Sequence, residues 1–101
     1  MIRGTTPVHV FNVNRDLREA TVYLTYKQDN STIITKTNAD LEISENAICA
    51  VLTQQDTLKF HESGLVEVQI RFVTKEGIAE ASEIIKMAVS KILKDGEIHY
   101  E

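Results

Sequence analysis

Strict alternation of apolar and polar residues in two stretches constrains the fold of this chain more than any other feature. The stretches cover residues 20–27 and 65–73, and both are rich in β-branched and aromatic residues. The apolar positions are Ala20, Val22, Leu24 and Tyr26 in the first stretch and Val66, Val68, Ile70 and Phe72 in the second. Because successive side chains of a strand point to opposite faces of a sheet, both stretches predict half-buried β-strands.

Other short apolar runs lie between clusters of turn-forming residues and predict further strands. Asp, Asn and Ser favour turns because their side chains bond the nearby backbone. Pro7 suits the start of a strand or an edge strand. The additional predicted strands are Val8–Val13, Thr32–Thr37, Leu41–Ile43 and Ala47–Leu52.

Residues 53–60 interrupt the strand pattern and predict a short helical turn. The Thr53 side chain is a common N-cap, and an acidic residue such as Asp56 is favourable near the positive end of a helix. We expect this turn to direct Leu58 and Phe60 towards the core. It would then connect two strands of a sandwich.

The segment after Gly77 is ambiguous. The apolar residues between positions 81 and 93 recur at the spacing of an amphipathic helix, but Ile85, Met87 and Val89 also lie on one face of a strand. A strand, a turn at Gly77 and a second strand form the final hairpin of immunoglobulin-like sandwiches. We therefore expect a strand at Ser82–Val89 with a possible helical turn at Ser90–Leu93, while a helix over 81–93 remains the alternative.

About seven short strands in about 100 residues predict an all-β fold of the immunoglobulin-like β-sandwich class. The chain has 101 residues, one proline and four glycines, with neither a low-complexity linker nor an internal repeat. We therefore expect a single domain that spans residues 1–101.

Composition excludes several classes of function. The 11 basic and 15 acidic residues give a net charge of −4, so the chain lacks the basic surface of a nucleic-acid-binding domain. No apolar run approaches the roughly 20 residues of a membrane helix. Residues 1–7 carry one positive charge with no apolar core after it, so we expect no signal peptide. The single cysteine, Cys49, cannot form an internal disulfide.

No motif indicates a catalytic, cofactor or metal site, and we expect none. Cys49 lies in an apolar strand and is predicted to be a small core residue. His9, His61 and His99 lack the spacing of metal ligands, and acidic residues 40–45 lack the glycine of a calcium loop. A small hydrolase that uses Cys49 or a carboxylate pair remains an alternative. We expect no small-molecule substrate.

Three stretches carry a resemblance to a known group of proteins. They are MIRGTTPVH (residues 1–9), LTQQDTLKF (residues 52–60), and VQIR (residues 68–71) followed beyond Gly77 by ASEII (residues 81–85). Together they resemble small uncharacterised proteins of phages and prophages of Gram-positive bacteria, over nearly the whole chain. A more distant similarity is to the N-terminal sandwich domains of phage baseplate upper proteins. Where these relatives often have Ile-Ile-Thr-Val-Ser-Val, residues 84–89 of this chain read IIKMAV.

The resemblance implies a non-enzymatic structural or interaction protein, associated with a phage tail or baseplate. Its expected partners are other phage structural proteins or further copies of itself, in the virion or in the bacterial cytoplasm during assembly. Candidate contact surfaces are the edge at Pro7–Val13 and the polar face around Tyr23. The alternative is a soluble accessory protein of a mobile element that binds a host or phage protein. Its acidic charge would favour basic partners.

Overall fold

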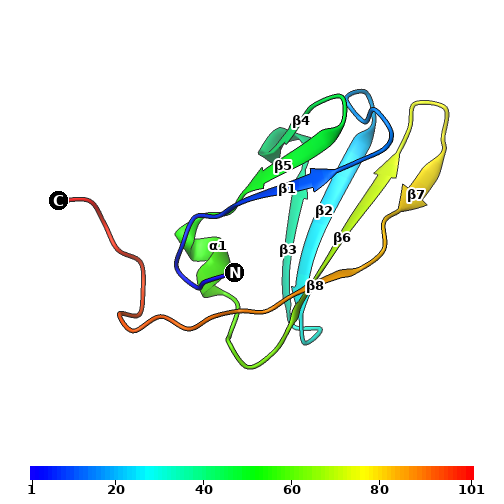
Figure 1. The fold of residues 1–101 in the computed structure, drawn as a ribbon. Helices are drawn as coiled ribbons and strands as arrows, with labels where there is room; N and C mark the ends of the chain where they lie inside the picture. Colours follow the sequence, from blue (N-terminus) through cyan, green and yellow to red (C-terminus); the bar gives the residue numbers. More distant parts are fainter.

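The chain folds into two antiparallel β-sheets with one short helix at one end (Figure 1). The computed structural model describes residues 1–101, except for the side chain of Thr32. The elements are β1 (Val8–Asn12), β2 (Thr21–Gln28), β3 (Thr32–Thr37), η1, a 3-10 turn (Asn38–Asp40), β4 (Leu41–Ile43), β5 (Ala47–Val51), α1 (Gln54–Leu58), β6 (Val66–Val73), β7 (Ala79–Ala81) and β8 (Ile85–Met87). The strand orders are β1-β5-β4 and β3-β2-β6-β7, and β8 also pairs with β6.

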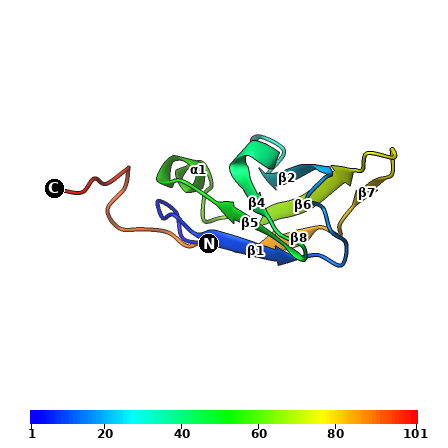
Figure 2. The same ribbon diagram turned by 90° about the horizontal axis from the view of Figure 1, so that it is seen from above.

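The core lies between the two sheets, which form separate layers (Figure 2). β2 and β6 pair from Thr21↔Val73 to Lys27↔Glu67, and this register places their two apolar faces on the same side of the sheet. The opposing sheet contributes Phe11, Ile48 and Ala50 to the core. All the predicted apolar positions of β2 and β6 are buried, except Phe72, which is half-buried. The prediction for these two faces is confirmed.

The first six predicted strands are all present, and each end lies within one residue of its predicted position. The hairpin turn at Gly77 is also confirmed, since Gly77 adopts a φ of 91°, a left-handed conformation that favours glycine. The structure has eight strands where the sequence predicts about seven.

The additional strand is β7, which lies before the predicted strand Ser82–Val89; of that predicted strand only β8 forms. β7 and β8 both pair with the same edge of β6, but the register changes by one residue, from Arg71↔Ala81 to Val68↔Ile85. At the break, the Ile70 amide donates to Ser82 Oγ over 3.0 Å, and the Ser82 amide donates to the Ile70 carbonyl over 2.8 Å. A serine hydroxyl thus takes the place of a backbone carbonyl, as one extra residue bulges out of the ladder.

The helical alternative for residues 81–93 is wrong, and so is the helical turn expected at Ser90–Leu93. Ile85 and Met87 instead pair with β6 as part of β8, Val89 is buried in the core, and residues 81–93 form no helix. Residues 1–3 lie beside its end. The Met1 nitrogen donates to the Ala88 carbonyl over 2.8 Å, and the Ser90 amide donates to the Met1 carbonyl over 2.8 Å.

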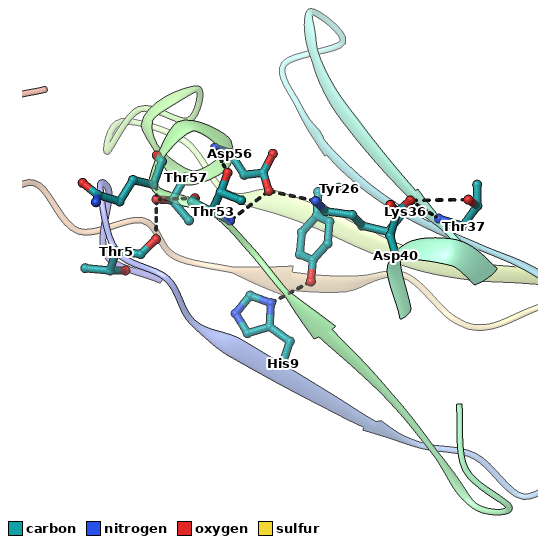
Figure 3. Close-up of polar contacts among 10 residues, drawn as sticks. Thr5, His9, Tyr26, Lys36, Thr37, Asp40, Thr53, Asp56 and Thr57 are labelled. Atoms are coloured by element: carbon teal, nitrogen blue, oxygen red, sulfur yellow. Dashed lines mark hydrogen bonds and ion pairs between the residues drawn. The ribbon is translucent and has the colours of Figure 1, made fainter. Parts of the chain in front are cut away.

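The helical turn predicted near 53–60 is confirmed as α1, with Thr53 as its N-cap. The Asp56 amide donates to Thr53 Oγ1 over 3.0 Å, and the Thr53 amide donates to Asp56 Oδ2 over 2.9 Å, which forms a reciprocal capping box (Figure 3). Phe60 is buried as expected, whereas Leu58 is half-buried and Thr57 occupies the fully buried position.

An ion pair connects α1 to β3. Lys36 Nζ lies 2.8 Å from Asp56 Oδ2, and both side chains are about 15% exposed. Burial alone would raise the pKa of Asp56, but hydrogen bonds from Lys36 and Thr53 outweigh it and hold this pKa below 3.8. Asp56 therefore stabilises the fold as an anion.

The variant Asp56→Asn is expected to lower the free energy of unfolding by about 2 kcal/mol, because it leaves the Lys36 ammonium unpaired in a partly buried place. Asp40→Asn is the matched control, since Asp40 completes the same type of capping box with Thr37 but is exposed. The control should cost about 0.5 kcal/mol or less. Urea denaturation measures both, and equal losses would contradict this account of α1.

Candidate interaction surface

An open groove separates β1 from the edge formed by β7 and β8. Its volume is about 1110 Å³, and its lining includes Val10, Phe11, Phe72, Ala81 and Ile85. Arg15 lies at its rim, with the guanidinium carbon 5.6 Å from the Phe72 ring centroid and a nitrogen 3.6 Å from Glu80 Oε2. The groove therefore combines apolar side chains with polar ones, among them Asn12, Asn14 and Ser82, and one ion pair lies beside it.

The groove is open because no strand of the described chain pairs with the outer edge of β1. The Val13 amide donates to Asn46, and the Leu52 amide donates to Pro7, so the odd-numbered residues of β1 bond to β5. In an antiparallel ladder these directions alternate along the strand. The amide and carbonyl groups of Val8, Val10 and Asn12 must therefore point away from β5, out of the sheet.

The edge of β1 also lacks the protection that the other edges carry. β1 contains no charged residue, whereas each of the other edge strands contains one. These charged residues are Lys36 in β3, Glu42 in β4, Glu80 in β7 and Lys86 in β8. Charges on an edge strand discourage pairing with another chain. β1 is thus the edge best suited to accept an added strand.

The outer face of the same sheet is apolar near β1. Val8 and Val10 are 60% and 57% exposed, and Val51 lies directly opposite Val8 in the neighbouring strand. Exposed apolar residues that lie together mark contact surfaces more reliably than isolated ones. The sequence had identified Pro7–Val13 as a candidate edge, and the structure places it at the edge of the three-stranded sheet.

Cys49 and Tyr23 both lie on outer faces. The expectation that Cys49 is a core residue is wrong, because Ile48 and Ala50 occupy the inward positions of β5 and leave Cys49 half-buried outside. His9 is opposite Ala50 in the ladder, so its side chain and that of Cys49 lie on different faces of the sheet. Tyr23 is exposed on the polar face of β2, as predicted. Its strand belongs to the other sheet from β1.

His9 and Tyr26 form a partly buried polar pair between the sheets. His9 Nδ1 lies 2.7 Å from the hydroxyl oxygen of Tyr26, a residue that is fully buried (Figure 3). Burial raises the pKa of Tyr26 far above its ordinary value and lowers that of His9 below 6.5. Both groups are therefore neutral at pH 7, and one hydrogen bond joins the Tyr26 hydroxyl to the His9 ring.

A Ser-His-Asp chain that the sequence did not indicate lies at the end of the molecule where β2 meets β3. Ser63 Oγ is 2.6 Å from His61 Nδ1, and His61 Nε2 pairs with Asp29. The same three residue types form the triad of serine hydrolases. Here all three side chains are exposed, and the His61 amide already donates to Gln28 Oε1 over 2.9 Å. None of the three side chains lines the groove described above.

Gln28 shows what this arrangement does structurally. Its buried amide donates to the carbonyls of His61 and Gly64 over 2.8 and 3.0 Å, in addition to accepting from the His61 amide. These bonds fasten the loop before β6 to the end of β2. The Ser63–His61–Asp29 chain reinforces the same connection at the surface.

Among the described residues, no group of three or more His, Cys, Asp or Glu side chains is arranged to hold a metal ion. Within the same part of the chain, no helix has the length and apolar character needed to cross a membrane. Comparison of the sequence and structure with protein-family models, curated proteins and solved structures gives no match. The free edge of β1 and the groove beside it are therefore the features from which a function can be argued.

The variant Gln28→Ala should lower the free energy of unfolding by about 2–4 kcal/mol, because it leaves two carbonyls and one amide without partners and opens a cavity. Gln69→Ala is the control, since the Gln69 side chain is half-buried and makes one bond, of 2.9 Å, to the Ser82 carbonyl. It should cost about 1 kcal/mol. If chemical denaturation gives equal losses, Gln28 does not have this role.

The lowered pKa of His9 predicts a loss of stability in mild acid. The unfolded chain binds a proton below about pH 6.5, before folded His9 does, so the free energy of unfolding falls as the pH drops below that value. Calorimetry at about pH 7.5 and about pH 5.5 should show that His9→Gln reduces this fall in Tm. His99→Gln, at an exposed position, should leave it unchanged. An identical pH dependence in all three proteins would refute the prediction.

Proposed function

We propose that this chain is a non-enzymatic structural component of a phage or prophage, associated with a tail or baseplate, that binds other proteins through β1. The observation that carries this proposal is the uncharged, unpaired edge of β1 beside a groove that apolar side chains line in part. An extended segment of a partner can add to such an edge, since the backbone supplies affinity and the groove selects side chains. The resemblance of residues 1–9, 52–60, 68–71 and 81–85 to phage and prophage proteins supports the setting.

The arrangement of the reactive side chains favours binding over catalysis. Cys49 and the His9 ring lie on opposite faces of one sheet, so they cannot form a nucleophile–base pair. The Ser63–His61–Asp29 chain is exposed, and the His61 amide is already engaged by Gln28, so this N–H cannot stabilise an oxyanion. Both features support a non-enzymatic protein.

We also propose that the two sheets follow the immunoglobulin-like order. The order β1-β5-β4 corresponds to strands B, E and D, and β3-β2-β6 followed by β7 and β8 corresponds to C′, C, F and G. In that arrangement strand A pairs with the outer edge of strand B. This is the edge of β1 that remains unpaired here.

Mass spectrometry of purified phage particles, after induction of the mobile element in its source strain, tests the proposed function. We expect peptides of this protein in the particle at a fixed ratio to a tail protein. Expression in the lysate without incorporation would overturn the structural role. That outcome would favour a soluble accessory protein that binds a host or phage protein.

Incorporation of the protein into particles should also depend on the edge of β1. A charged residue at an exposed edge position, as in Val10→Lys, should remove the protein from particles, because a lysine discourages strand addition. Tyr23→Lys is the control on the other sheet, where the side chain is also exposed. Equal incorporation of both variants would show that β1 is not the contact surface.

A further inference from the structure

We propose that residues 97–101 of a second copy of this chain add to β1 as a strand and fill the groove. This inference rests on the proposed function, because it names the partner of the same edge. It predicts that copies join head to tail, with the segment of one copy in the groove of the next. Such a contact uses two different surfaces, so repetition gives rings or filaments.

The donor segment has the sequence pattern of a strand. In EIHYE, residues 97–101, apolar Ile98 and Tyr100 alternate with polar Glu97, His99 and Glu101. Tyr100 is fully exposed and Ile98 is 59% exposed, so neither contributes to the core of its own copy. Large apolar side chains in this state indicate a surface that is covered by a partner.

The segment also lies outside the body of the molecule. It extends beyond α1 in both views (Figures 1 and 2). The radius of gyration is 14.6 Å, whereas a compact chain of this length has a value of about 13 Å. The described contacts of residues 97–101 with the body are polar. Gln54 exchanges two hydrogen bonds of 2.9 Å with the Ile98 backbone, and Gln55 donates to Glu97 over 3.3 Å.

The acceptor edge matches a strand of this kind. The outward amides and carbonyls of Val8, Val10 and Asn12 can pair with the backbone of the added segment. Its apolar face would then meet the groove, where Phe11, Phe72 and Ile85 are available to Ile98 and Tyr100. In the proposed immunoglobulin-like order, the added strand takes the position of strand A.

The occupant must come from another copy. In both views the segment lies at the end of the molecule that holds α1, whereas β7 and the end of β1 that lines the groove lie at the other (Figures 1 and 2). Moving Ile98 to a neighbouring molecule gives up only exposed polar contacts with Gln54. Strand addition replaces these with backbone bonds and buries two apolar side chains.

A complementation experiment tests the inference. One variant, Val10→Pro, loses the outward amide of the acceptor edge but retains the donor segment; proline is tolerated at such edge positions. The other variant, Ile98→Asp with Tyr100→Asp, loses the donor but retains the groove. Sedimentation velocity should show concentration-dependent association of the natural protein, monomers for each variant alone, and a one-to-one complex when the variants are mixed.

Several controls separate association from misfolding. Both variants should retain the far-UV circular dichroism and cooperative melting of the natural protein, and Val10→Lys replaces Val10→Pro if the proline variant does not fold. His99→Asp, which alters the polar face of the donor, should associate like the natural protein. A fluorescein-labelled peptide of residues 91–101 should bind to the donor variant but not to Val10→Lys.

The inference is overturned if the natural protein stays monomeric at every concentration, or if the mixed variants do not associate. Incorporation into phage particles is measured separately. A monomeric protein that is nevertheless found in particles would refute self-association and leave the proposed function intact. A protein that self-associates but is absent from particles would support self-association and refute the proposed role in the particle.

Discussion

The pairing of β2 with β6 is the constraint on which the rest of the structure depends. Its register, from Thr21↔Val73 to Lys27↔Glu67, places two apolar faces side by side. A shift by one residue would turn one of these faces to solvent, so the register is strongly determined. The resulting surface is too apolar to remain uncovered, and the three-stranded sheet covers it with Phe11, Ile48 and Ala50. β3, β7 and β8 then extend a ladder that is already in place.

Polar groups inside this framework are paired, and they fix the ends of the molecule. No buried side-chain nitrogen or oxygen of the described residues lacks a hydrogen-bond partner. His9 satisfies the hydroxyl of Tyr26, Gln28 holds the loop before β6, and Lys36 holds α1 through Asp56. Because an unsatisfied buried group costs about 1–3 kcal/mol, each of these contacts specifies one arrangement of its segment. They act as positioning contacts rather than as a reactive site.

Local patterns were sufficient to predict most elements, but not the contacts between distant segments. Alternation identified β2 and β6, and Thr53 with Asp56 identified α1, because both signals lie within a few residues. The break at Ser82 was missed because its cause is a bond to Ile70 across the ladder. Cys49 was assigned to the wrong face because apolar residues alone do not reveal the phase of β5. The Ser63–His61–Asp29 chain joins residues 32 positions apart, a proximity that no local pattern encodes.

The central claim is that the outer edge of β1 is unpaired in the isolated molecule: the sequence indicates an edge at Pro7–Val13, and the strand order shows that no strand of the described chain pairs with it. Amide hydrogen exchange in dilute solution measures it residue by residue. The account predicts alternation along β1, with slow exchange at His9 and Phe11, whose amides bond to β5, and fast exchange at Val8, Val10 and Asn12. Uniform protection along β1, or protection of the even-numbered residues, would contradict it.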